Sequence, residues 1–153
     1  MEQLWFLADL AEVLVDREDF SLVRMHAPAG DQPPLHVHEH EDEGFYVLSG
    51  SLTVWVGDAA PVTLSPGEFA MAPHGIPHTY RVGDADGVFL VTSAPGTFVG
   101  FVREVGRPAL RPELPVLDGP PDVARLARIA TDHGITLLGP PGTLPSDLVA
   151  AAA

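Results

Sequence analysis

The chain has 153 residues, which suffices for one domain with a sizeable core, and its formal charge of −13 argues against nucleic acid or an anionic membrane surface as a partner. It has no cysteine and no lysine among its eight basic residues, which excludes disulfides, thiolate metal sites and Schiff-base chemistry. No apolar run approaches the roughly 18 residues of a membrane span. The start Met1–Gln3 lacks the positive charge of a signal peptide, so we expect a cytoplasmic protein.

The first third of the chain predicts short extended segments. Residues 4–15 are apolar apart from interruptions such as Asp9, and their pattern fits two short strands or one helix. Residues 20–26 alternate well enough to form a strand, and the turn region that follows, residues 27–34, carries Gly30 and three prolines.

A histidine-rich segment comes next. His36 and His38 point to the same face of a strand because side chains two residues apart share a face. Glu43 can join them from the start of the next strand if residues 39–42 form a turn. Imidazole and carboxylate ligands suit zinc, iron, manganese, nickel, cobalt and copper, so the segment predicts a metal site.

Several nearby residues could compete for this role. His40 continues the parity of the first two histidines, and Glu41 and Asp42 are alternative carboxylates. We expect His40 to lie in the turn and the two acids to be solvated. His26, His74 and His133 are expected to be ordinary surface residues or to support the site from outside.

The middle of the chain predicts further strands at residues 52–56, 62–64, 78–82 and 88–92, separated by turns rich in glycine and proline. This punctuation indicates an all-β sandwich or barrel. By parity, a pocket beside the metal would be lined by Phe45, Val47, Tyr80 and Val82. Such an apolar pocket, with no lysine to hold a phosphate, argues against a sugar-phosphate substrate.

The composition changes near residue 105. Residues 107–121 hold five prolines and form an expected linker. A helix is predicted from about 122 to 133, with an apolar stripe, before Gly134. We therefore divide the chain into a barrel, residues 1–105, and a proline-rich linker, helix and tail packed on it, residues 106–153. The helix could close the pocket or brace the outer sheet.

Two segments together resemble the motifs of the cupin superfamily over roughly residues 20–95. The first motif, G-x5-H-x-H-x4-E-x6-G, is matched by Gly30, His36, His38, Glu43 and Gly50. The second, G-x5-P-x-G-x2-H-x3-N, is matched by Gly67, Pro73, Gly75 and His78, whereas Val82 stands where the family often has asparagine. Residues 103–141 resemble the C-terminal extension of small bacterial quercetinase-like monocupins.

The resemblance implies a double-stranded β-helix, or jelly-roll barrel, with a short C-terminal helical extension, and it favours strands for residues 4–15. It also implies one divalent transition metal ion held by His36, His38, Glu43 and His78. Cupins are commonly dimers through edge strands, so a homodimer is expected, and residues 4–15 would suit that interface.

The resemblance to quercetinases implies a metal-dependent dioxygenase that acts on an apolar or aromatic, flavonol-like enol together with dioxygen. Glu43 would then take the substrate proton as the catalytic residue. Two alternatives remain open: a non-catalytic metal-dependent binding or sensor protein, and a metal-assisted isomerase or hydrolase.

Overall fold

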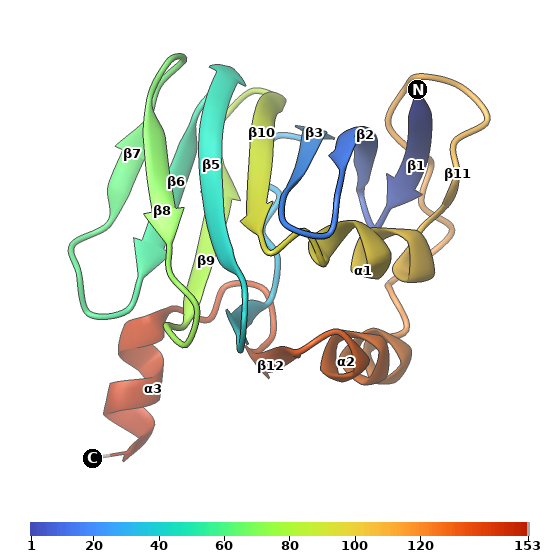
Figure 1. Ribbon diagram of the computed structural model, residues 1–153. Coiled ribbons are helices and arrows are strands. Elements are labelled where there is room, and N and C mark those ends of the chain that lie inside the picture. The colour runs from blue at the N-terminus through green and yellow to red at the C-terminus, as the bar shows by residue number, and fades with distance from the viewer. Residues whose placement is uncertain (153) are drawn as a thin grey trace.

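Two antiparallel β-sheets face each other in the computed structural model, which describes residues 1–152 (Figure 1). The larger sheet has seven strands, in the spatial order β11 (Arg107–Pro108), β1 (Glu2–Phe6), β2 (Asp9–Asp16), β3 (Ser21–Ala27), β10 (Gly87–Ala94), β5 (Asp42–Ser49) and β8 (Phe69–Ala72). The smaller sheet has five, in the order β12 (Ile135–Gly139), β4 (Leu35–His38), β9 (His78–Val82), β6 (Leu52–Val56) and β7 (Val62–Leu64). This is the double-stranded β-helix that the sequence motifs imply.

The strands form where apolar side chains alternate, because successive residues of a strand face opposite sides of the sheet. In β3 and β10, every second residue is buried between the sheets. Val23 and Met25 from β3 meet Phe89 and Val91 from β10 in one core, which includes aromatic side chains from both sheets. Alternation thus fixes which side chains face the barrel interior.

Residues 4–15 form the hairpin β1–β2, with the turn at Leu7, whose φ is 54°. The prediction of two strands is therefore confirmed for this segment. Part of the outer edge of β1 pairs within the chain with the two-residue strand β11, where Leu4 lies opposite Pro108. Trp5 is buried, and its indole donates to the carbonyl of Glu113 at 2.8 Å.

Three helices complete the described chain: α1 (Phe98–Val105), α2 (Val123–Asp132) and α3 (Pro145–Ala152). The sequence predicted α2, whose N-cap Asp122 accepts a hydrogen bond from the Arg125 amide at 3.0 Å. It predicted neither α1 nor α3. Among the described residues, no helix is long and apolar enough to cross a membrane.

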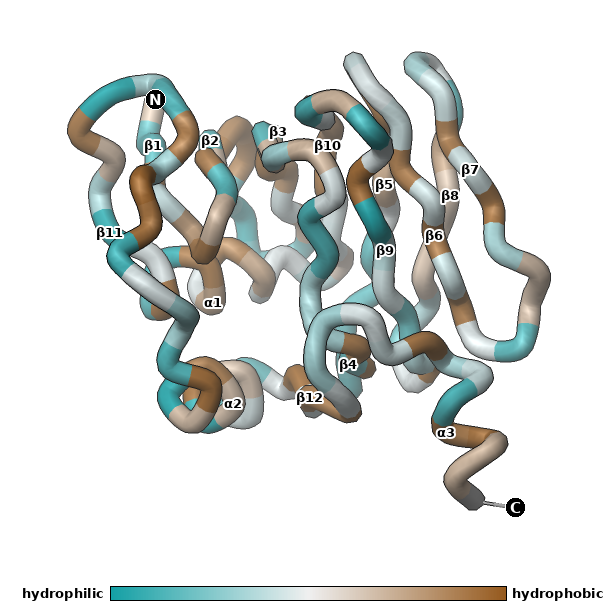
Figure 2. Tube along the Cα trace, turned by 180° about the vertical axis from the view of Figure 1, so that it is seen from behind, coloured by the Kyte–Doolittle hydropathy of each residue, from teal (hydrophilic) through white to brown (hydrophobic). Residues whose placement is uncertain are grey.

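The chain beyond residue 105 enters both sheets. β11 pairs with β1, and β12 adds to β4 with Ile135 opposite His38 and Leu137 opposite His36. Seen from the opposite side, hydrophobic residues recur along α2 and β12 where these elements close one end of the barrel (Figure 2). The C-terminal segment therefore supplies an edge strand as well as a helix.

One of the motif glycines shows why glycine is needed at that point. Gly50 follows β5 with a φ of 75°, and a Cβ atom there would lie 2.7 Å from the carbonyl oxygen of Asp86. Any other residue would both adopt an unfavourable backbone conformation and collide with the neighbouring turn. The glycine allows the chain to turn tightly from β5 into β6.

Asp9, at the start of β2, is a buried carboxyl that lies beside Asp31. It is 3% exposed, and its Oδ1 has no hydrogen-bond partner among the described residues. Burial, together with the Asp31 carboxylate, raises the pKa of Asp9 well above its ordinary value.

This raised pKa predicts a pH-dependent stability. Between the pKa of Asp9 in the unfolded chain and its higher pKa in the folded chain, the folded state binds more protons, so the free energy of unfolding falls as pH rises. Each pKa unit of difference contributes about 1.4 kcal/mol. Asp9→Asn should therefore stabilise the protein at neutral pH and flatten this fall, as measured by urea unfolding across pH.

Asp58→Asn, which alters an exposed carboxylate in the β6–β7 turn, is the matched control and should leave the pH profile unchanged. An Asp9→Asn protein less stable than the wild type at neutral pH would contradict this account of the pair.

Candidate metal centre

Three imidazoles and one carboxylate converge at the end of the barrel. His36 and His78 are direct register partners on β4 and β9 of the small sheet, and Glu43 comes from β5 of the large sheet. His36, His38, Glu43 and His78 each offer one ligand atom, and these atoms all lie within 4.8 Å of one another. Two metal–ligand bonds of about 2.1 Å span at most about 4.2 Å, so one ion would bind all four residues once the outermost ligand atoms move inward by a few tenths of an ångström.

Each histidine is held by its outer nitrogen, Nδ1. The Nδ1 atoms of His36 and His78 lie 2.7 Å and 3.3 Å from the carbonyl oxygens of Pro34 and Ile76. The Nδ1 of His38 lies 2.6 Å from Oε1 of Glu41. An acceptor facing each Nδ1 places a proton there and leaves Nε2 available toward the centre, which is the usual arrangement around a protein-bound metal.

One carboxylate oxygen of Glu43 faces all three imidazoles. Its Oε2 lies 2.9 Å from Nε2 of His78, 3.1 Å from Nε2 of His38 and 4.0 Å from Nε2 of His36. The buried Nε2 of His38 nevertheless makes no hydrogen bond of acceptable geometry. A buried nitrogen without a hydrogen bond, aimed at a carboxylate and two other imidazoles, fits a metal ligand, so the donor set suits a divalent transition metal.

The charges in the cluster depend on one another. Burial disfavours the charged form of Glu43, but the charge of His38 and the closeness of the three imidazoles, of which His78 makes a hydrogen bond at 2.9 Å, lower its pKa well below the ordinary value. Burial likewise opposes the charge of His38, yet Glu43 and Glu41 raise its pKa to about 10. The pKa of His36 falls to about 4 through burial and the nearby His78. Glu43 is therefore ionised at neutral pH.

Glu41 corrects the expectation that it is solvated. The side chain is only 3% exposed, and its second oxygen accepts a hydrogen bond from Thr97, the residue before α1, at 2.5 Å. The turn between β4 and β5 folds this carboxylate back beneath His38. No spacing rule distinguishes it from its neighbour Asp42, which is partly exposed and instead accepts from the backbone N–H and Nδ1 of His74.

The remaining histidines lie away from the cluster. The side chain of His40 is 80% exposed and points toward Glu39, so it does not join the other ligands. His74 is exposed, and His133 pairs with Glu104 at 2.7 Å. His26 lies 3.6 Å from Asp86.

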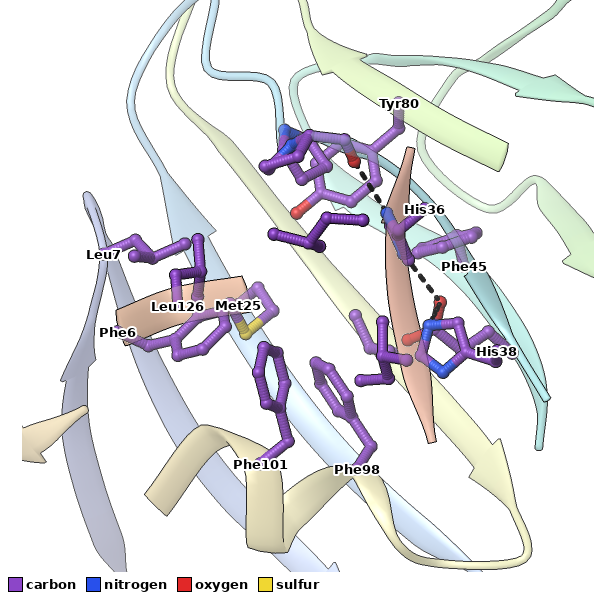
Figure 3. Close-up of a pocket in the computed structure, with 16 residues that line it drawn as sticks. Phe6, Leu7, Met25, His36, His38, Phe45, Tyr80, Phe98, Phe101 and Leu126 are labelled. Carbon is purple, nitrogen blue, oxygen red and sulfur yellow. Dashed lines mark hydrogen bonds and ion pairs between the residues drawn. The ribbon is translucent and has the colours of Figure 1, made fainter. Parts of the chain in front are cut away.

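An apolar cavity of about 60 Å³ adjoins the cluster (Figure 3). Phe45 and Tyr80 line it, as parity predicted. Val47 and Val82 do not line it, although they are buried in the barrel. They share the inward face, but parity does not show how far along the barrel a side chain lies from the ligands.

The sequence did not predict the rest of the cavity wall, which comes from α1, the N-terminal hairpin and the C-terminal segment. Phe98 and Phe101 rise from α1 and pack beside Phe6 of the N-terminal hairpin, and Leu7 of the same hairpin also lines the cavity (Figure 3). Leu126 of α2 and Ile135 and Leu137 of β12 also contribute. The signals were present in the helical spacing of Phe98, Val99, Phe101 and Val102 and in the alternation of Ile135 and Leu137.

The fold and the cluster define a small β-barrel of the double-stranded β-helix type with a three-histidine, one-glutamate centre. Residues 23–93 match the cupin domain family. Two similar proteins are quercetin 2,3-dioxygenases: that of Bacillus subtilis (strain 168) is 35% identical over 58% of this chain and 26% of its own length, and that of Aspergillus japonicus is 31% identical over 57% and 27%. The chain thus spans about a quarter of the length of these relatives.

A solved structure, TT1209 from Thermus thermophilus, is 31% identical, with a TM-score of 0.53, and the alignment covers 57% of this chain and 83% of that one. The match of residues 23–93 to the cupin domain agrees with the double-stranded β-helix fold. In sequence, the chain is similar to the two quercetin 2,3-dioxygenases.

Replacing His78 tests the cluster as a metal site. The imidazole is fully buried, so His78→Ala removes one ligand and should leave the purified protein with far less than one bound metal ion per chain. His74→Ala, which removes an exposed imidazole, should retain the wild-type metal content. Elemental analysis of both variants, folded by circular dichroism, provides the measurement; undiminished metal in His78→Ala would refute the ligand set.

Glu41 supplies a second, separate test. If it orients His38, Glu41→Ala should weaken metal affinity about 10–100-fold, measured by titrating the apoprotein against a chelator. Glu39→Ala removes an exposed carboxylate from the same turn and serves as the control. Equal affinities for the two variants would show that the hydrogen bond to His38 does not matter for binding.

Proposed function

We propose that the protein is a metal-dependent dioxygenase that acts on an apolar enol. The observation that carries this proposal is the position of the ligand cluster, which opens directly onto a cavity lined by Phe45, Tyr80 and Phe98. The similarity to two quercetin 2,3-dioxygenases supports the same reaction class.

The four ligand residues would hold one divalent transition metal ion, of iron, nickel, manganese, cobalt, copper or zinc. With four protein ligands, such an ion supplies open coordination positions and a Lewis-acid or redox centre for an enol oxygen and dioxygen. The chain itself contributes the orientation of the imidazoles through Pro34, Glu41 and Ile76.

Glu43 is the residue that would take the substrate proton. Its carboxylate is ionised at neutral pH, is 4% exposed and lies in the cavity wall. An enol that enters the cavity loses its O–H proton to a Glu43 oxygen, which gives an enolate and a neutral carboxyl group. A general base needs hydrogen-bond reach to that proton, and the cavity wall supplies it.

The cavity wall also restricts the substrate. Its lining residues, all in the described part of the chain, include no arginine, so it offers no clamp for a phosphate. Aromatic and aliphatic side chains surround the space beside the ligands. An apolar small molecule suits this wall better than a sugar phosphate.

Glu43→Gln distinguishes catalysis from binding alone. The amide keeps the shape and a coordinating oxygen but not the basicity, so oxygen uptake with an enol substrate should fall about 10²–10⁴-fold at equal metal content. Glu39→Gln, at an exposed position of the turn before β5, should keep full activity.

A non-catalytic binding protein would give no enol-dependent oxygen uptake even before mutation. A Glu43→Gln enzyme with full metal and full turnover would leave Glu43 as a ligand only.

A further inference from the structure

The cavity beside the ligand cluster is small for a polycyclic substrate. Its volume is about 60 Å³. Typical pockets for drug-sized ligands measure about 300–1,000 Å³. Since one water molecule needs about 10–15 Å³ on this scale, the space beside the ligands equals that of roughly four to six water molecules, which suits a body no larger than one small ring.

The polar groups of the wall lie mainly at one end. His36, His38 and Glu43 form that end, and Tyr80 carries the one polar side-chain group on the rest of the wall. Pro33 and Pro34 also line the cavity, but their carbonyl oxygens already accept hydrogen bonds from Thr79 and His36. Apart from the Tyr80 hydroxyl, a polar group on the part of a substrate away from the ligands would therefore meet only apolar side chains.

Packing and hydrogen bonds hold the α1 side of the cavity wall in place. Phe101 packs edge-on against Phe6 with ring centroids 5.6 Å apart, and Phe98 packs against the same ring at 6.3 Å. Behind them, α2 holds the end of α1: the Arg125 guanidinium donates to the Glu104 carbonyl at 2.9 Å, and His133 pairs with the Glu104 carboxylate. The size of the cavity is thus set by packed aromatic rings and by hydrogen bonds between helices.

We propose that the site selects compact enols with one polar end: two adjacent oxygens that face the ligand cluster and a small apolar body without further hydroxyl groups. This inference rests on the proposed function. It excludes polyhydroxylated flavonols from the substrates that the site prefers. A buried hydroxyl without a partner lowers affinity, because it gives up its hydrogen bonds to water.

Two hydroxypyranones provide a matched test. Allomaltol and kojic acid share the same chelating end, and they differ by one distal hydroxyl. Binding is measured without dioxygen to the full chain loaded with nickel, by calorimetry and by the metal's visible spectrum. Allomaltol should bind about tenfold or more tightly than kojic acid, which corresponds to about 1.4 kcal/mol, and more tightly than quercetin.

Tyr80→Phe identifies any hydrogen bond to the distal hydroxyl. If kojic acid binds the wild type as tightly as allomaltol, the proposal that the site accepts only one polar end is wrong. The same holds if that tight binding is lost in Tyr80→Phe, since Tyr80 would then hold the distal hydroxyl. Tighter binding of quercetin than of allomaltol would overturn the size limit, and binding of none of the three would overturn the enol site.

A variant of the wall contributed by α1 tests the size limit directly. Phe98→Leu opens the cavity with little change in character and should raise quercetin affinity severalfold relative to the wild type. Phe20→Leu, at a half-exposed position outside the cavity, should not change it. An unchanged quercetin affinity in Phe98→Leu would contradict the role of α1.

Because these measurements record binding, they separate this inference from the proposed reaction. Selective binding of allomaltol without oxygen uptake for any enol would remove the dioxygenase proposal and leave the selectivity intact. Oxygen uptake with quercetin, together with equal affinities for quercetin and allomaltol, would support the dioxygenase proposal and refute the selectivity.

Discussion

One buried carboxylate, Glu43, constrains the whole barrel end. It comes from the large sheet, yet its Oε2 lies within 4.0 Å of imidazole nitrogens of the small sheet. A buried charge needs close compensation, because leaving it unpaired costs several kcal/mol. The cluster therefore ties the two sheets together, and each histidine must keep its nitrogen directed at the same point.

That requirement explains the surroundings of the site. Glu41 holds His38 and, through Thr97, reaches the start of α1, whose Phe98 and Phe101 form the cavity wall. β12 pairs with the strand that carries His36 and His38, so the C-terminal segment both supports the ligands and lines the cavity. The residues that orient the ligands and the residues that limit the substrate are thus connected through short contacts.

The sequence predicted what depends on local periodicity. Strand parity was enough to place His36 and His38 on one face, and motif spacing added Glu43 and His78. The sequence did not predict that Glu41 is buried. Burial of this turn carboxylate depends on the position of Thr97, which is 56 residues away in the chain. Strand parity also does not show how far along the barrel axis a side chain lies from the ligands. Val47 and Val82 were therefore grouped with Phe45, although they do not line the cavity. β12 was not predicted because this short edge strand is stabilised by pairing with β4, which lies far from it in the sequence.

X-ray absorption spectroscopy of the nickel-loaded protein tests the central claim most directly. The account predicts a first shell that contains three imidazoles and at least one carboxylate oxygen, since His36, His38, His78 and Glu43 all point their ligand atoms at one centre. A shell with two or fewer imidazoles, or with oxygen ligands alone, would contradict it.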